Sequence, residues 1–317
     1  MRPATGSAIM LLVLGLRPCV SASGDESVVV TATWLAAARQ SLGSKLVIAE
    51  VSWTQGGVAR EYDAGHVPGA IHIDTDVFEN GSPRWHLLPP DRLSRALGEL
   101  GIGSDSVVVV YSHQTVAAAR VWWVMQYAGV ADVRYLDGGL GAWKRAGFKV
   151  ETTRSQLPPT VFQAKPREHL LAATDYVRER RQTAVLADVR SPREFRGETS
   201  GYSYLKAKGR IHGAVAAGDA SDQARLYQNP DGTLRRVEEI RKLWQEAGLL
   251  TDDGREVIFY CGSGWRSSLA LLYARLMGLH NVRNYSDGWS GWSTRYEQSP
   301  DGRWRQHPSS NPVARGR

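Results

Sequence analysis

The chain of 317 residues contains one series of segments twice, and this repeat limits its possible folds more than any other feature. The stretch at 107–147, VVVVYSHQTVAAARVWWVMQYAGVADVRYLDGGLGAWKRAG, aligns with the stretch at 256–295, EVIFYCGSGWRSSLALLYARLMGLHNVRNYSDGWSGWSTR. Upstream, GHVPGA (65–70) aligns with GRIHGA (209–214). Matched segments in the same order indicate a duplicated domain. We therefore expect two domains of similar architecture.

Each copy alternates short apolar runs with amphipathic stretches. The apolar runs are continuous and rich in β-branched residues, as buried parallel strands are. They lie at 46–51, 107–111 and 132–136 in the first copy and at 184–189, 256–260 and 281–285 in the second. The stretches at 92–101, 235–249 and 266–278 have helical spacing. This alternation predicts an α/β fold in which each domain is a mainly parallel sheet flanked by helices on both faces.

The composition along the chain indicates where the domains begin and end. A hydrophobic content of 42% and a charged fraction of 22% fit two globular domains, which we place at 28–150 and 166–298. Residues 151–165 are polar and contain prolines, so they are predicted to be an interdomain linker. Residues 299–317 have no apolar period and are predicted to form a basic flexible tail.

The N-terminus has the features of a secretory signal peptide. Arg2 precedes a short apolar run, AIMLLVLGL, and VSA at 20–22 places small residues before a cleavage site after Ala22. The apolar run is too short to span a bilayer, so no stable membrane span is expected after cleavage, although an uncleaved anchor is the alternative. We predict that residues 1–22 direct export to the periplasm or the medium.

Cleavage would remove Cys19 and leave Cys261 as the one cysteine of the mature chain. An unpaired thiol in an oxidising compartment suggests reactivity. The formal charge of +7 is compatible with a small anionic substrate. No basic stripe with interleaved aromatic residues is present, so nucleic acid is not an expected partner. We expect a monomer.

Cys261 follows the apolar run VIFY and precedes an amphipathic stretch, so it is expected at the end of a strand and just before a helix. Gly262 and Gly264 allow a tight loop with inward N–H groups, which favour negative charge together with the helix N-terminus. Such surroundings lower a thiol pKa and produce a nucleophile. The alternative is an inert buried thiol. The residues expected to surround a bound substrate are Gly262, Ser263, Gly264, Trp265 and Arg266.

Several motifs together resemble those of the tandem-domain rhodaneses, which are sulfurtransferases. They are GHVPGAIHID and YLDGGLGAW in the first copy, and DVRSPREF, GRIHGA, YCGSGWRSS and SDGWSGW in the second. The resemblance covers residues 28–298. It implies that the thiolate of Cys261 attacks the outer sulfur of thiosulfate, that sulfite leaves, and that cyanide or a thiol then takes the sulfur from the resulting persulfide. It implies no metal or organic cofactor, and no cluster with zinc-ligand spacing is present.

Loop length separates this interpretation from the phosphatases that pair a cysteine with an arginine. Those loops place five residues between the two and usually a histidine before the cysteine, whereas CGSGWR leaves four and follows Tyr260. A non-catalytic persulfide carrier is a further alternative. The first copy has SHQTVAAAR at the matching position, with Ser112 in place of Cys261 and Ala117 in place of Arg266. We therefore predict that the first domain is inactive and helps to wall the cleft, with a solvated His113.

The sequence leaves open the identity of the sulfur donor and the role of one further arginine. The loop begins as CGSG, like the loops of 3-mercaptopyruvate sulfurtransferases, and continues as WRSS, which resembles the thiosulfate-type loops that carry arginine. We favour thiosulfate, because a fixed cation suits a compact dianion, and keep 3-mercaptopyruvate as the alternative. Arg190 in ADVRS stands where the family often carries an arginine, so it is a candidate for substrate binding or for an ion pair. Arg193 and Arg196 are weaker candidates.

Overall fold

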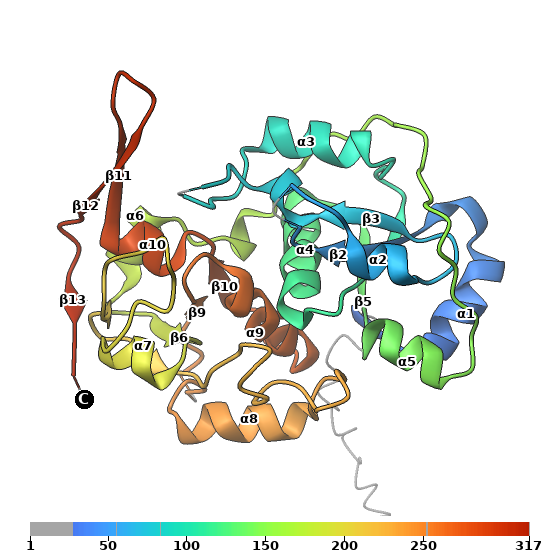
Figure 1. Cartoon of the computed structure of the whole chain (residues 1–317). Coiled ribbons are helices and arrows are strands. Elements are labelled where there is room, and N and C mark those ends of the chain that lie inside the picture. Colours follow the sequence, from blue (N-terminus) through green and yellow to red (C-terminus); the bar gives the residue numbers. More distant parts are fainter. Residues whose placement is uncertain (1–27, 55, 83, 252, 317) are drawn as a thin grey trace, which may run out of the picture.

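The computed structural model describes residues 28–54, 56–82, 84–251 and 253–316 (Figure 1). The predicted signal peptide at 1–22 and Cys19 lie outside the described residues. No helix in the described part of the chain combines the length and apolarity needed to cross a bilayer.

The first domain is built on a five-stranded sheet in which every neighbouring pair is parallel. Its strand order is β1 (Val29–Val30), β5 (Asp132–Leu136), β4 (Val107–Tyr111), β2 (Leu46–Ser52) and β3 (Ile71–Asp74). The central strands β2 and β4 are almost wholly buried, because helices cover both of their faces.

Two layers of helices cover this sheet. One apolar cluster joins Leu35, Tyr62 and Trp143 to Ile48 and Val109 of the strands. It lies between the sheet and the helices α1 (Ala32–Ser41), α2 (Arg60–Ala64) and α5 (Gly139–Arg145). The opposite face packs on α3 (Pro90–Glu99) and α4 (Thr115–Ala128). Short 3-10 turns lie at Gly43–Lys45 (η2) and Thr75–Phe78 (η3).

The second domain repeats this plan with four parallel strands. Their order is β10 (Val282–Tyr285), β9 (Val257–Tyr260), β6 (Val185–Asp188) and β8 (Val215–Ala216). The helices α6 (Thr174–Arg180) and α10 (Gly288–Ser293) pack on one face, and α8 (Val237–Glu246) and α9 (Trp265–Leu276) on the other. The short elements η4 (Glu168–Leu170) and α7 (Pro192–Arg196) complete it. The predicted fold, two α/β domains with parallel sheets and helices on both faces, is confirmed.

The two domains share one hydrophobic core. Trp122 and Trp123 of α4 and Leu271 and Leu272 of α9 belong to the same buried cluster, and these two helices pack on each other. Helix α4 is buried on nearly all sides, as expected of a helix that lies between two sheets rather than on a surface. This shared layer holds the loop before α9 against the first domain.

The C-terminal segment differs from the prediction. The flexible tail expected at 299–317 contains β12 (Trp304–Pro308), which forms an antiparallel hairpin with β11 (Thr294–Gln298), and β13 (Val313–Ala314), which pairs with β7 (Arg210–Ile211). The hairpin projects from the second domain in Figure 1. The partner of β13 lies about a hundred residues earlier in the chain, so no local periodicity could reveal this pairing.

Candidate active site

The loop from Cys261 to Gly264 connects the buried strand β9 to helix α9. Gly264 has a φ of +87°, in the left-handed region that favours glycine. A Cβ at this position would lie 2.6 Å from Nη1 of Arg120 and 2.7 Å from the carbonyl oxygen of Ser286. Glycine is therefore required both by the turn and by the close approach of two other segments.

Hydrogen bonds to helix α10 orient the peptide groups of this loop. The Trp289 N–H donates to the carbonyl of Cys261 at 2.7 Å, and the Ser290 N–H donates to the carbonyl of Gly262 at 2.9 Å. In a trans peptide the N–H points away from its carbonyl. The N–H groups of Gly262 and Ser263 therefore face the opposite side, where the first meets the Tyr202 hydroxyl and the second the thiol of Cys261. This arrangement makes the interior of the loop attractive to an anion.

Cys261 is 1% exposed and lies at the base of this loop. Burial alone would raise the pKa of its thiol, but the Arg266 guanidinium and the N–H groups of Ser267 and Ser263 outweigh burial and lower the pKa. The Ser267 hydroxyl also approaches Sγ at 3.7 Å. These groups favour the thiolate, which is the nucleophilic form. Ser267 was not singled out from the sequence; its place in the first turn of the following helix was the available signal.

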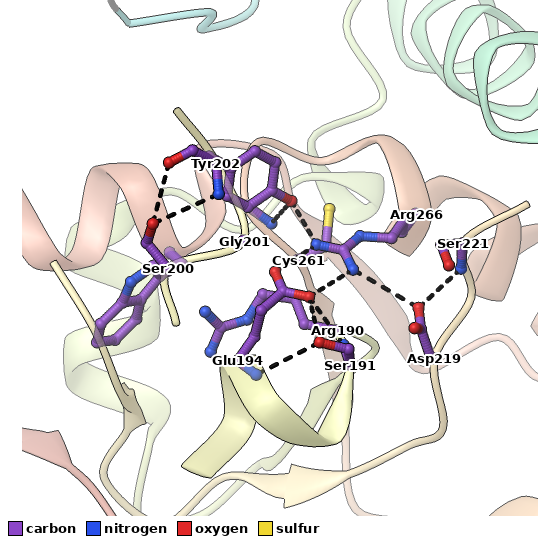
Figure 2. Close-up of polar contacts among 12 residues, drawn as sticks. Arg190, Ser191, Glu194, Ser200, Gly201, Tyr202, Asp219, Ser221, Cys261 and Arg266 are labelled. Carbon is purple, nitrogen blue, oxygen red and sulfur yellow. Dashed lines mark hydrogen bonds and ion pairs between the residues drawn. The ribbon is translucent and has the colours of Figure 1, made fainter. Parts of the chain in front are cut away.

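Arg266 lies beside Cys261, but its charge is already compensated (Figure 2). Its Nη1 and Nη2 donate to the Glu194 carboxylate at 2.9 and 2.7 Å, and Nη2 also donates to the Tyr202 hydroxyl at 2.5 Å. Asp219 is 3.6 Å away. The fixed cation expected to suit a bound dianion is thus already part of a bidentate ion pair. Arg266 acts on the sulfur through its field, with little net charge left for substrate.

Glu194 is held in place by the start of helix α7. Ser191 and Glu194 form a capping box, in which the Ser191 N–H donates to Oε2 of Glu194 at 3.0 Å and the Glu194 N–H donates to the Ser191 hydroxyl at 3.3 Å. Burial would raise the pKa of Glu194, but hydrogen bonds from Arg266 and Ser191 outweigh burial and lower it. Sequence reasoning missed Glu194, although the pattern SPRE at 191–194 is a capping-box signature.

Tyr202 covers the loop from the other side. Its hydroxyl accepts the Gly262 N–H at 3.0 Å, and a Cβ on Gly262 would lie 2.0 Å from the Tyr202 ring carbon Cζ. The hydroxyl thus receives one of the N–H groups expected to face a substrate. The sequence carried no signal for Tyr202, because it lies in an irregular segment 59 positions before Cys261.

Arg190 forms an ion pair and does not face the substrate cavity. Its side chain is buried and donates to both carboxylate oxygens of Asp188, at 2.9 and 2.7 Å, and to the carbonyl of Gly209 at 2.9 Å. It does not line the cavity in front of Cys261. Arg193 and Arg196 are exposed and pair with Glu198. None of the three therefore has the position of a substrate ligand.

A cavity of about 630 Å³ opens in front of Cys261, between the two domains. Among the predicted site residues, Ser263, Trp265 and Arg266 line it with Cys261, while Gly262 and Gly264 do not. Trp265 donates its indole N–H to Glu79 of the first domain at 2.9 Å. Further lining residues come from both domains, among them Trp53, Trp85, Gln114, Val116, Glu194, Tyr202, Tyr204, Asp219, Ser221 and Asp222.

The matching loop of the first domain carries no nucleophile or arginine. The Ser112 hydroxyl accepts the N–H of Gln114 at 2.9 Å, so it belongs to its own turn. His113 is 41% exposed and lies 3.8 Å from Glu61. Within the described ranges there is also no group of three or more His, Cys, Asp or Glu side chains that could hold a metal ion.

Comparison with known proteins agrees with this geometry. The family model described as "Rhodanese-like domain" matches residues 31–146 and 173–295. The thiosulfate sulfurtransferase YnjE of Escherichia coli (strain K12) is 39% identical over 259 residues, which are 78% of this chain and 57% of that protein. The 3-mercaptopyruvate sulfurtransferase of the same strain is 31% identical over 244 residues, which are 75% of this chain and 84% of that protein.

Among solved structures, the anaerobic ergothioneine biosynthesis enzyme of Chlorobium limicola, in complex with trimethyl histidine, matches with a TM-score of 0.77 and 31% identity. The match covers 92% of this chain and 70% of that chain. The two matched segments of the family model coincide with the two α/β domains and include the loop of Cys261. The chain belongs to the rhodanese family and contains two rhodanese-like domains.

Proposed function

We propose that the chain is a sulfurtransferase that carries sulfur as a persulfide on Cys261. The observation that carries this proposal is a buried thiol with a lowered pKa at the base of a cavity, surrounded by inward N–H groups. The thiolate attacks the outer sulfur of the donor, the donor's sulfur–sulfur bond breaks, and its electron pair leaves with sulfite. A nucleophilic acceptor then attacks the outer sulfur of the persulfide, and Cys261 leaves as the thiolate.

Thiosulfate is the donor that we propose, with 3-mercaptopyruvate as the alternative. The names of the relatives support either donor. The pairing of Arg266 with Glu194 implies that thiosulfate is held mainly by loop N–H groups, so we expect it to bind weakly. The test compares kcat/KM for the two donors with cyanide as acceptor. A higher value for 3-mercaptopyruvate would replace thiosulfate as the donor and leave the sulfurtransferase proposal standing.

The acceptor that we propose is cyanide or a thiol. A methylated amino acid is a second candidate, because one structural relative is in complex with trimethyl histidine. The aromatic lining of the cavity favours this second candidate. Mass spectrometry of the protein after thiosulfate treatment should show one added sulfur atom on Cys261. An added sulfur that no acceptor discharges would instead support a persulfide carrier.

Export of a mature chain that begins after Ala22 also stays a proposal, supported by the composition of residues 1–22. Cell fractionation with N-terminal sequencing tests it. Recovery of the uncleaved chain in the membrane fraction would favour the anchor.

A further inference from the structure

The wall of the cavity in front of Cys261 contains five aromatic side chains, and both domains contribute to it. Trp53 and Trp85 come from the first domain, and Trp265, Tyr202 and Tyr204 from the second. Trp53 packs edge-on against Trp85 and Trp265, with ring centroids 6.0 and 6.4 Å apart. The ring centroids of Trp85 and Tyr204 are 6.5 Å apart, and those of Tyr204 and Tyr202 are 5.3 Å apart. The five rings thus form one continuous chain of contacts.

The backbone that places Trp85 in this wall has an unfavourable conformation. Trp85 has a φ of +54°, which is rare for a bulky residue. Such a backbone persists only where the surroundings impose it. Here the Trp85 N–H donates to the carbonyl of Gly81, and the Asn80 N–H donates to that of His86, so the turn is held from both sides. Trp53 remains 39% exposed although it is a large apolar side chain. Neither ring serves the core of its own domain.

The charged groups of the cavity are mostly carboxylates. Four line it, at Glu79, Glu194, Asp219 and Asp222, against one guanidinium, that of Arg266. Glu194 pairs with Arg266, and Glu79 accepts from Nε of Arg120 at 2.9 Å.

The other two carboxylates lack an equally close cation. Asp219 lies 3.6 Å from the arginine that Glu194 already neutralises. Asp222 accepts from the Val116 N–H and the Gln228 amide, both at 3.3 Å. It forms no ion pair within the described residues. The cavity is therefore lined by carboxylates as well as by aromatic rings.

We infer that the part of the cavity lined by Trp53, Trp85, Trp265 and Asp222 binds a quaternary ammonium group on the sulfur acceptor. Aromatic rings and carboxylates together recognise such a cation, which has no hydrogen to donate and needs no acceptor. A cavity of about 630 Å³ accommodates an organic molecule and greatly exceeds the space needed by thiosulfate or cyanide. The inference rests on the proposed persulfide and gives the first domain a role in selecting the acceptor.

The experiment uses two thiols of the same shape. Thiocholine carries a trimethylammonium group, and 3,3-dimethylbutane-1-thiol carries a neutral tert-butyl group in its place. The chain is loaded with sulfur, the load is measured by mass spectrometry, and its discharge is followed at equal thiolate concentrations. The acceptor thiolate attacks the outer sulfur, the bond to Sγ breaks, and Cys261 is regenerated as thiolate. We expect kcat/KM for thiocholine to be about tenfold higher. Equal values would overturn the inference.

Variants locate the effect. Trp85→Leu and Asp222→Asn should each reduce the preference for thiocholine by several-fold, because each removes one part of the subsite. Trp34→Leu is the matched control, since Trp34 lies on α1, outside the cavity, and stacks on Arg134. If both cavity variants keep the full preference for thiocholine, the ammonium group binds elsewhere and the inference is wrong.

Failure of the proposed function and failure of the ammonium subsite give different results. If thiosulfate adds no sulfur to Cys261, the proposed donor fails, and loading with inorganic polysulfide still allows the acceptor comparison. If neither reagent produces a persulfide, the proposed function itself fails. If the persulfide forms and both thiols discharge it equally, only the ammonium subsite fails.

Discussion

The loops after β4 and β9 occupy the same place in the two domains and differ in their chemistry. In each domain, the first residue of a later short helix is a glycine that approaches the loop, Gly139 of α5 in the first and Gly288 of α10 in the second. A Cβ on Gly139 would lie 3.0 Å from the carbonyl oxygen of Ser112, and one on Gly288 would lie 2.6 Å from that of Cys261. The backbone framework is therefore shared. Because the first loop exists without a thiol or an arginine, the fold does not require Cys261 or Arg266.

The space in front of the two loops differs as well. At the first loop, the Val116 N–H near the start of α4 donates to the carboxylate of Asp222 from the second domain. Thr115 bonds to Gln228 of the same segment. The helix N-terminus that would attract an anion is thus already occupied. At the second loop, Cys261 and Ser263 line the open cavity. The repeat thus contains two equivalent loops, and in the first a carboxylate from the other domain takes the place at the helix N-terminus that an anion would occupy.

Cys261→Ser makes the second loop resemble the first and should have the largest effect. The serine hydroxyl has no base to activate it and cannot carry sulfane sulfur, so thiocyanate formation from thiosulfate and cyanide should fall by at least about a thousandfold. Adding Ser112→Cys to this variant should restore nothing, because Ala117 provides no guanidinium. Activity in either protein would contradict the assignment of the nucleophile.

Arg266→Ala imitates the first domain at Ala117. Without the guanidinium the pKa of Cys261 should rise, and the rate of alkylation by iodoacetamide should reach its midpoint at a higher pH. The variant also leaves the buried Glu194 without its partner, which costs about 3 kcal/mol of folding free energy. Denaturant unfolding measures this loss. Adding Glu194→Gln should recover part of the stability while the alkylation midpoint stays high.

Glu194→Gln removes the partner of Arg266 and keeps the guanidinium. It releases the charge of Arg266, so KM for thiosulfate should fall by about tenfold, as expected for one charge-assisted hydrogen bond. Steady-state kinetics over a range of thiosulfate concentrations tests this. Glu198→Gln is the control, because Glu198 is 45% exposed and pairs with arginines outside the cavity. An unchanged KM would mean that Arg266 does not meet the donor.

The smallest effect concerns pH. Despite burial, the folded chain lowers the pKa of Glu194, so its charge contributes stability above the unfolded glutamate value of about 4.3. This contribution is lost as the pH falls through the lower folded value. As the pH falls through the carboxyl range, the wild type should therefore lose more unfolding free energy than Glu194→Gln. Equal losses would show that Glu194 does not titrate in this range.

Some features of the chain follow from the sequence alone. The repeated segments predict two α/β domains, and the order strand, Cys261, glycines, helix predicts where the thiol lies. These predictions succeed because they depend on neighbouring residues, since backbone periodicity and loop length act over short stretches of chain. The spacing of Cys261 and Arg266 belongs to the same class, because both sit on one loop and the helix that follows it.

Contacts between distant segments were decided only by the tertiary structure. The ion pair of Arg266 with Glu194, the cover of Tyr202 over the loop, and the pairing of β13 with β7 each join segments that are far apart in the chain. From the sequence, Arg190 was a candidate both for substrate binding and for an ion pair. Its burial beside Asp188 decides for the ion pair. The sequence shows which charges and rings exist. Only packing determines which of them meet, and so whether an arginine faces a substrate or a carboxylate.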